Sequence, residues 1–395
     1  MIKDSHIVLG ITGSIAAYKG ADLASKLTQG GAVVDVVMTK AACELIRPMT
    51  FKALTNRPIH TDMWDVDHEG ISHIELAKAA DAVLIAPASA DFIAKLAYGL
   101  ADDLLSATVL ATRSPIVIAP AMNVNMYENS VTQENIQKLK NRGFVFIEPD
   151  EGHLACGDVG RGKLADVEDI IGTMHKIIGR SGPMAGKKVI VTAGGTREPI
   201  DSVRFISNLS SGKMGYAIAE AARDQGANVV LVTSSQIKTP AGIESIHVQT
   251  ALEMHDAVLK ACKDADAIIM AAAVADYHLE KPFKNKIKKK SATLDLSLVR
   301  TPDIIAEVSG DIIKIGFAAE SENINKNAIE KLNKKGLDLI VANDVTQDAW
   351  GFGSEYNKVT LIDPEGNINE FPVMTKRKVA DIICDWLTSC PKWVK

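Results

Sequence analysis

Cysteine is scarce in this sequence, and its placement excludes two classes of protein. The 395 residues contain five cysteines, Cys43, Cys156, Cys262, Cys384 and Cys390, and no two of them form a CxxC pair. An odd number of widely separated cysteines argues against a disulfide framework and against a zinc site. We therefore expect a protein of a reducing compartment, the cytoplasm.

Long apolar runs, a signal segment and a strong net charge are also missing. No uninterrupted apolar stretch approaches the ~20 residues that span a bilayer, and a short strand-like segment follows the first few residues. The net charge is only −5, which gives no sign of a nucleic-acid surface. We expect neither export, nor a membrane anchor, nor nucleic-acid binding, so any phosphate must be bound by local groups.

The chain does contain 47% hydrophobic residues, over a length that favours two domains. Apolar, β-branched runs alternate with segments of helical periodicity such as Ser14–Gln29 and Asp91–Ala111. Continuous hydrophobicity indicates strands buried on both faces, which is typical of a parallel sheet between helices in an α/β fold. The runs are His6–Gly10, Ala32–Met38, Ala82–Ala86 and Ile116–Ala119.

A segment rich in Gly, Pro and Ser separates two halves with the same pattern. We predict one domain over 1–180, a linker over 181–186 and a second domain over 187–395. The second half repeats the strand, helix and strand order at Lys187–Thr192, Lys213–Gln225 and Asn228–Thr233. The fold class is therefore α/β, with two open, mostly parallel Rossmann-like sheets in tandem. Further strands are expected at Ala267–Ala272, Ile312–Phe317, Leu337–Ala342 and Lys358–Ile362, and a closing helix at Met374–Leu387.

The first strand of the first half ends in a glycine turn that suits an anion. Gly10–Ser14 leads into a helix start, where free N–H groups and the helix dipole favour phosphate. The turn is not GxGxxG, and both second strands end in threonine, Thr39 and Thr233, where a dinucleotide fold usually carries an acid. NAD is therefore disfavoured in both halves, and a turn that only closes a βα unit stays an alternative.

The second half carries an insertion, Ala193–Ser211, after its first strand, where an open sheet holds ligands. The run from Asn208 to Gly215 resembles a phosphate cradle without being a Walker A sequence. Downstream, a lysine run over 284–290 follows a strand end that carries Asp276. Lysines neutralise phosphates and a carboxylate can hold Mg²⁺, so a triphosphate with a divalent cation suits this pair. A solvated surface turn is the alternative for the lysine run.

One cysteine lies in a glycine-rich segment, Ala155–Lys163, together with Arg161. Neighbouring cations and backbone amides lower the pKa of a thiol, whereas apolar burial raises it. The segment predicts a reactive Cys156, and the alternative is an incidental cysteine on a mobile surface loop.

Motifs along essentially the whole chain resemble those of one enzyme family. In the first half, Gly70-Ile-Ser-His73, Pro120-Ala-Met-Asn123 and Ala155-Cys156-Gly157 match in order the His, PxMN and Cys motifs of flavin-dependent cysteine decarboxylases. The sequence thus resembles the bifunctional coenzyme A biosynthesis flavoproteins, phosphopantothenoylcysteine decarboxylase fused to phosphopantothenate–cysteine ligase. The ligase signatures are matched by Thr192–Asp201, Arg204–Gly215, Ala272–Tyr277, Lys286–Lys288 and Gly316–Glu320.

For the first half, the resemblance implies an FMN-dependent oxidative decarboxylation. Asn123 would orient the substrate carboxylate, His73 would act at the thiol, and Cys156 would donate a proton. Three residues depart from the family pattern: Asp91, which we do not assign to the phosphate because like charges repel, Tyr127 and Lys163. The residues implied near FMN are Gly13, Ser14, Thr39, Ser89 and Ala90.

For the second half, the resemblance implies that the carboxylate of 4′-phosphopantothenate attacks the α-phosphate of CTP. The resulting acyl-cytidylate then loses CMP to the amine of cysteine. Lys286 would stabilise the triphosphate charge, while Asn208 and Arg204 would hold the acyl group. With Asp276 as the Mg²⁺ ligand, the motif and the resemblance together assign the nucleotide to Ser211, Gly212, Lys213, Ala271, Ala272, Asp276, Lys286, Pro302, Asp303, Ile304, Ile305, Phe317, Lys331 and Lys335.

The resemblance also implies a homo-oligomer of decarboxylase trimers joined through ligase dimers, with small molecules as the other partners. Three other functions stay open at this point. They are a decarboxylase acting on peptidyl cysteine, a nonenzymatic flavin-binding regulatory subunit and a dinucleotide reductase, which the missing fingerprint disfavours.

Overall fold

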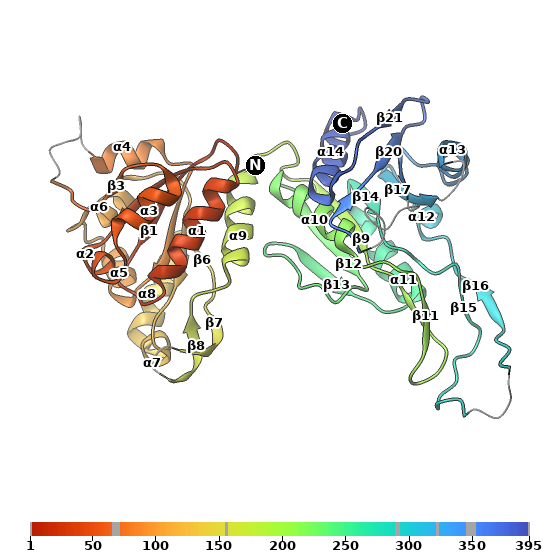
Figure 1. The fold of residues 1–395 in the computed structure, drawn as a ribbon, viewed down its shortest axis with the longest axis horizontal. Coiled ribbons are helices and arrows are strands. Elements are labelled where there is room, and N and C mark those ends of the chain that lie inside the picture. Colours follow the sequence, from red (N-terminus) through yellow and green to blue (C-terminus); the bar gives the residue numbers. More distant parts are fainter. Residues whose placement is uncertain are drawn as a thin grey trace. The chain divides into compact units, whose positions relative to one another are not determined.

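The computed structural model describes residues 2–64, 72–154, 157–288, 293–320, 324–344 and 353–393. It divides into two compact units, Met1–Gly179 and Arg180–Lys395, each with its own sheet and helices (Figure 1). Both units have the α/β architecture that the sequence predicts. Among the described helices, none has both the length and the apolar composition needed to cross a bilayer.

The sheet of the first unit is entirely parallel, with the strand order β3-β2-β1-β4-β5-β6. Its central strands are buried on both faces, as their continuous apolar runs predict. The strands are β1 (His6–Ile11), β2 (Val33–Met38), β3 (Ile59–His60), β4 (Ala82–Ala88), β5 (Ile116–Pro120) and β6 (Val145–Phe146). The helices are α1 (Ala17–Gln29), α2 (Lys40–Leu45), α3 (Pro48–Thr55), α4 (Ser72–Ala79), α5 (Ala90–Tyr98), α6 (Leu104–Ala111), α7 (Val124–Glu128), α8 (Ser130–Asn141) and α9 (Val167–Gly179).

The periodic segment Asp91–Ala111 is two helices, not one. Helix α5 ends where Gly99 adopts a left-handed conformation with φ of 71°. Helix α6 begins after Asp103, whose carboxylate accepts from the Ser106 N–H at 2.8 Å in a capping box. These end signals divide a hydrophobic pattern that continues through both helices.

The sheet of the second unit has the order β13-β12-β9-β14-β17-β18-β20-β21. All pairs from β13 to β18 are parallel, whereas β20 and β21 add an antiparallel edge. The strands are β9 (Lys188–Ala193), β12 (Asn228–Thr233), β13 (Glu244–His247), β14 (Ala267–Met270), β17 (Ile313–Glu320), β18 (Leu339–Asp344), β20 (Val359–Ile362) and β21 (Ile368–Glu370). The helices are α10 (Lys213–Asp224), α11 (Ala251–Ala261), α12 (Ile304–Glu307), α13 (Ile324–Lys335) and α14 (Lys376–Ser389).

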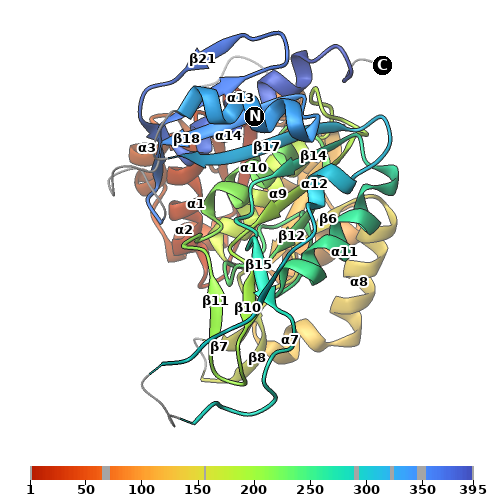
Figure 2. The same cartoon turned by 90° about the vertical axis from the view of Figure 1, so that its right-hand side faces the viewer.

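Short paired strands lie outside the two large sheets. The insertion after β9 forms the antiparallel pair β10 (Arg197–Pro199) and β11 (Phe205–Ser207). It runs away from the large sheet beside β15 (Tyr277–Leu279) and its partner β16 (Leu298–Arg300), and we call these four strands the arm (Figure 2). Two further pairs are β7 (Asp150–His153) with β8 (Val159–Lys163), and β19 (Tyr356–Asn357) with β22 (Met374–Thr375).

In each large sheet the strand order reverses beside the first strand. The reversal lies between β1 and β4 in the first unit and between β9 and β14 in the second. Open α/β sheets bind ligands at the carboxyl ends of the strands at such a point. The fold therefore places one candidate site in each unit.

Candidate active sites

Three loops meet at the carboxyl edge of the first sheet. Ser14 follows β1, Thr39 follows β2 and Ser89 follows β4, and these three strands are neighbours. The Thr39 hydroxyl accepts from the Ala42 N–H at 3.2 Å and caps α2, and the Ser89 hydroxyl accepts from the Phe92 N–H at 3.3 Å and caps α5. The structure thus brings together the loops that we predicted around the FMN phosphate, including Ala90 as the first residue of α5.

Thr12, which sequence reasoning did not place in the site, ties two of these loops together. Its buried hydroxyl donates to the Pro87 carbonyl oxygen at 2.7 Å and accepts from the Ser89 N–H at 2.8 Å. Gly13 allows the β1 loop to approach α2 closely, because a Cβ there would lie 2.6 Å from the Ala41 Cβ. The one feature of the sequence that could have indicated this function of Thr12 is its position directly before Gly13 in the glycine turn.

The three residues that depart from the family pattern, Asp91, Tyr127 and Lys163, lie in different surroundings. Asp91 is exposed in the first turn of α5, where its carboxylate stays solvated. Tyr127 is buried and donates to Glu148 at 2.7 Å, and burial, followed by this carboxylate, raises the pKa of Tyr127 to about 12. Lys163 is exposed on β8, next to the buried Leu164.

The predicted carboxylate-binding residue Asn123 lies against the hairpin that follows it in the chain. Its side-chain oxygen accepts from the Asn125 N–H at 2.8 Å and caps α7, while its amide donates to Asp158 at 2.7 Å. The Met122 N–H donates to the Gly162 carbonyl oxygen at 2.9 Å, and a Cβ at Gly162 would lie 2.3 Å from the Met122 carbonyl oxygen. The PxMN segment and the β7–β8 hairpin are therefore packed as one piece.

The structure describes the predicted His73 but not the predicted Cys156. Cys156 lies outside the described residues, as does Gly70 of the His motif. His73 is half-buried in the first turn of α4, and because α4 runs back to the start of β4, this turn lies toward the carboxyl edge of the sheet. In the described part of the chain, no hydrogen bond joins His73 to Asn123.

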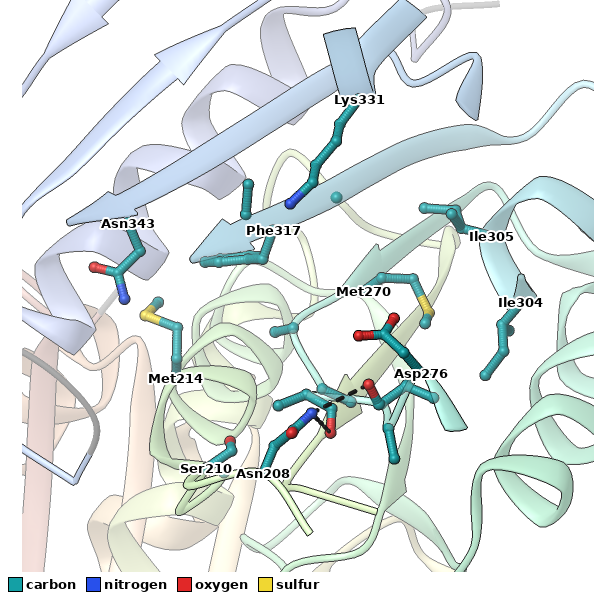
Figure 3. A pocket seen from close by; sticks show the side chains of 18 of the residues that line it. Asn208, Ser210, Met214, Met270, Asp276, Ile304, Ile305, Phe317, Lys331 and Asn343 are labelled. Atoms are coloured by element: carbon teal, nitrogen blue, oxygen red, sulfur yellow. Dashed lines mark hydrogen bonds between the residues drawn. The ribbon is translucent and has the colours of Figure 1, made fainter. Parts of the chain in front are cut away.

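The second unit contains a cavity of about 830 Å³ at the carboxyl edge of its sheet (Figure 3). Its walls come from the segment before α10, the end of β14, α12, β17 and α13. The structure thus gathers residues that the sequence assigned from segments far apart in the chain. The predicted residues that line it are Asn208, Ser211, Gly212, Lys213, Ala271, Ala272, Asp276, Pro302, Asp303, Ile304, Ile305, Phe317, Lys331 and Lys335.

Asn208 is fixed against the segment that follows β14. Its amide donates to the carbonyl oxygens of Ala273 and Val274 at 3.3 and 3.2 Å (Figure 3). Two buried hydroxyls that we did not predict hold that segment in turn. Thr192 accepts from the Ala272 N–H at 3.1 Å, and Thr196 accepts from the Ala275 N–H at 2.9 Å. The wall that positions Asn208 is therefore held to β9 by Thr192 and to the start of the insertion after β9 by Thr196.

Charged and apolar groups share the α12–α13 end of the cavity. The Lys335 ammonium lies 3.1 Å from the Asp303 carboxylate, and Lys331 reaches toward Phe317 in Figure 3. The exposed Asp276 offers a carboxylate on the same side as Ile304. No group of three or more metal-ligating side chains occurs in the described ranges, but Mg²⁺ commonly takes one carboxylate and completes its shell with phosphate oxygens and water. The donor set at Asp276 fits a phosphate-bound Mg²⁺.

Two predicted catalytic residues, Arg204 and Lys286, lie on or beside the arm and do not line the cavity. Asp201 joins their segments, because its buried carboxylate accepts from the Arg204 N–H at 2.9 Å and from the Ile287 N–H at 3.0 Å. The Arg204 guanidinium also donates to Asp201 and, more than any other group, holds the pKa of that carboxyl well below its usual range. The structure therefore holds the segment of Lys286 beside that of Arg204 through Ile287, and the Lys286 side chain is exposed.

Two family models match consecutive parts of the chain. The Flavoprotein model matches residues 1–179, and the model of the DNA/pantothenate metabolism flavoprotein C-terminal domain matches residues 184–390. Together they account for nearly all residues.

One curated relative is similar over nearly the full length, and two solved structures are each similar to about half of the chain. The Coenzyme A biosynthesis bifunctional protein CoaBC of Bacillus subtilis (strain 168) is 45% identical over 388 residues, which are 96% of each chain. A crystal structure of the C-terminal domain of a CoaBC protein is 37% identical and covers 53% of this chain and 97% of that chain, with a TM-score of 0.46. A crystal structure of the FMN-dependent cysteine decarboxylase SpaF is 34% identical and covers 44% of this chain and 96% of that chain, with a TM-score of 0.39.

Proposed function

Because this chain belongs to the family of bifunctional coenzyme A biosynthesis proteins, we propose how its two units divide the reaction. The protein is a flavoprotein enzyme of coenzyme A biosynthesis with a decarboxylase and a ligase activity. The ligase reaction takes place in the cavity of the second unit, and the decarboxylation at the switch point of the first. The observation that carries this assignment is the cavity beside Asn208, with cationic side chains and a carboxylate around one continuous space.

In the ligase cavity, the carboxylate of 4′-phosphopantothenate attacks the α-phosphorus of CTP. The bond to the β-phosphate breaks, pyrophosphate leaves, and an acyl-cytidylate forms. The amine of cysteine then attacks the acyl carbon, so that CMP leaves and the amine loses a proton. Lys331 and Lys335 neutralise the triphosphate, and Asn208 positions the acyl group. Asp276 would hold a Mg²⁺ bound to the triphosphate, which would neutralise further charge on the phosphate oxygens.

In the first unit, the loops of Ser14, Thr39 and Ser89 fit the phosphate of FMN, because they present hydroxyls and helix starts at one sheet edge. When bound, FMN supplies the two-electron oxidation that makes loss of the carboxylate possible. Asn123 orients that carboxylate from the start of α7, and Cys156 donates the proton that the final reduction requires. His73 acts on the substrate thiol.

The arm also supports the proposed assembly of ligase dimers, which the decarboxylase trimers join into a larger oligomer. Its exposed apolar side chains include Phe205 on β11 and Leu298 on β16, together with Phe283 beyond β15. Apolar groups concentrated on an extended feature are typical of a protein interface. We propose that two arms pair across the dimer, and we keep the prediction of a cytoplasmic enzyme.

The proposed reactions are tested on the purified full-length protein. We expect a yellow protein that releases FMN on denaturation. With CTP, Mg²⁺ and 4′-phosphopantothenate it should release pyrophosphate, and added cysteine should yield 4′-phosphopantetheine and carbon dioxide. A colourless protein that FMN does not reconstitute, and that releases no pyrophosphate, contradicts the proposal.

Replacing Thr12 by valine is expected to weaken FMN binding without unfolding the first unit. The change leaves the Pro87 carbonyl oxygen and the Ser89 N–H without their shared partner, a loss of about 1–3 kcal/mol that corresponds to a rise in Kd of about 5- to 150-fold. Fluorescence titration of the apoprotein with FMN measures this Kd.

Thr55→Val is the matched control for this substitution. Thr55 is also buried, but its hydroxyl donates to the Phe51 carbonyl oxygen within α3, which leads into the amino end of β3. The control should bind FMN as the unchanged protein does. Equal affinities of the two variants would show that Thr12 does not shape the flavin site.

A further inference from the structure

Helix α12 forms part of the wall of the ligase cavity although it is only about one helical turn long. It spans Ile304–Glu307, and the buried side chains of Ile304 and Ile305 line the cavity (Figure 3). A single helical turn is not stable on its own in water, so contacts with neighbouring elements must hold it in place. The shape of this wall therefore depends on the groups that anchor α12.

Apolar packing and an ion pair connect α12 to the helices around it. Ile304 belongs to a buried cluster with Met254 of α11, whereas Ile305 belongs to a cluster that includes residues of α13. Directly before α12, the Asp303 carboxylate lies 3.1 Å from the Lys335 ammonium on α13. Because apolar packing is not directional, polar contacts at the two ends of α12 define its position more closely.

The polar contact at the other end of α12 comes from His255 on α11, which lies beside α12 (Figure 2). The Nε2 atom of His255 lies 2.9 Å from the Glu307 carboxylate, and its Nδ1 atom lies 2.9 Å from the Asp256 carboxylate. A neutral imidazole has one N–H and donates to only one of these carboxylates, whereas an imidazolium donates to both. The geometry therefore fits the protonated ring.

The charged groups that face His255 are these two carboxylates, Asp256 on its own helix and Glu307 on α12. The strand β12, which also packs on α11, carries no titratable side chain. The turn after α11 carries Lys263 and Asp264, and neither forms a hydrogen bond or an ion pair with the ring. The charge of the ring is therefore balanced by acidic groups alone.

This environment makes the contact between α11 and α12 dependent on pH. The hydrogen bond to Glu307, followed by that to Asp256, raises the pKa of His255, whose side chain is only 16% exposed. The stabilisation is complete below the ordinary pKa of histidine and is lost as pH rises through the raised pKa. One end of α12 thus has an anchor that is released on deprotonation.

We propose that His255 is a positioning residue for the nucleotide, because its protonated ring ties Glu307 to α11 and so holds α12 in the cavity wall. This rests on the proposed ligase function. Deprotonation releases one end of α12, so nucleotide binding weakens as pH rises. Asn208, on another wall of the cavity, positions the acyl group, so binding of the acid does not depend on this contact.

The test compares the unchanged full-length protein with His255→Gln by calorimetric titration with CTP and Mg²⁺ at about pH 6 and about pH 9, on either side of the histidine range. Comparison of two proteins at one pH cancels the titration of the nucleotide. At about pH 6 the Kd for CTP should be about fivefold higher in the variant, whereas at about pH 9 the two proteins should bind alike. In turnover at about pH 6 the KM for CTP should rise by the same factor, with kcat and the KM for 4′-phosphopantothenate unchanged.

Two further variants separate this function from a merely structural one. The Glu307 side chain is 50% exposed, so Glu307→Gln removes the carboxylate without altering a buried group, and it should raise the Kd by a similar factor at about pH 6. His255→Gln should then add nothing in the Glu307→Gln background. The matched control is His247→Gln, since His247 is an exposed histidine on β13 whose ring faces Ser245, and this variant should bind CTP as the unchanged protein does.

The inference is overturned if His255→Gln binds CTP like the unchanged protein at about pH 6, if the difference persists at about pH 9, or if it remains in the Glu307→Gln background. Should His255→Gln fail to fold, the comparison of Glu307→Gln with the unchanged protein at the two pH values decides alone. Normal CTP binding and pyrophosphate release without any effect of these variants would contradict this inference only. Absence of CTP binding to the unchanged protein would contradict the proposed ligase reaction as well.

Discussion

Lys286→Gln is expected to stop the ligase before the acyl-cytidylate forms. Charge builds up on the triphosphate as pyrophosphate leaves, and removing a cation that is aimed at such charge costs about 10²- to 10³-fold in rate. The loss should appear as absent pyrophosphate release when CTP and 4′-phosphopantothenate are supplied without cysteine. Mass spectrometry should find no acyl-cytidylate.

Lys284→Gln is the matched control, since Lys284 is exposed on the same segment two residues earlier. Its rate should remain near that of the unchanged protein, because we assign it no contact with the nucleotide. Normal formation of the intermediate in Lys286→Gln would remove Lys286 from the mechanism.

The position of Lys286 makes a second measurement informative. It is exposed, and it lies outside the residues that line the cavity of its own chain. If paired arms bring it to the cavity of the other copy, a Lys286→Gln chain and an Asn208→Ala chain should complement one another. Random mixing of the two inactive chains should then restore about a quarter of the sites. No recovery in mixed dimers would contradict an exchange of arms.

The central strands could be predicted because burial on both faces leaves continuous apolar runs. β12 spans Asn228–Thr233, the residues that its sequence indicates, β1 and β2 differ from their predictions by one residue at one end, and β9 is shifted by one residue. The antiparallel edge formed by β20 and β21 could not be predicted in the same way. Its direction depends on pairing with β18, which no local pattern records. The division between α5 and α6 did carry local signals, at Gly99 and Asp103, but the hydrophobic pattern crosses them.

The candidate sites follow the same division between local and tertiary information. Glycine turns and motif residues could be assigned to the sites from the sequence because they directly follow predicted strands. The carboxyl ends of parallel strands lie at one edge of the sheet, so residues that follow them lie close together. Thr12 was missed because its function as a bridge depends on Ser89, 77 residues away. Lys376 is buried in the cavity wall although it begins a helix, where a basic residue is normally solvated, so its burial could not be read from the sequence.

Cys156→Ser is expected to leave the first unit able to remove the carboxylate but unable to finish the reaction. A serine hydroxyl is a far weaker acid than a thiol, so proton delivery to the oxidised ene-thiol should fail, and the yield of 4′-phosphopantetheine should fall about 10²- to 10⁴-fold. Carbon dioxide release should continue for one turnover, and mass spectrometry should find a species two hydrogen atoms lighter than the normal product.

The nearest matched control is Cys43→Ser, in the same unit. Burial, followed by the charge of Glu44, raises the pKa of the Cys43 thiol, which makes it a poor proton donor and a poor nucleophile at neutral pH. This variant should give the full yield of 4′-phosphopantetheine. Asn123→Ala is a second comparison, a variant that should be impaired in the earlier step. It should slow carbon dioxide release itself, whereas Cys156→Ser should not. A full yield from Cys156→Ser would mean that another acid delivers the proton, and the β7–β8 hairpin that packs on the Asn123 segment would then serve binding alone.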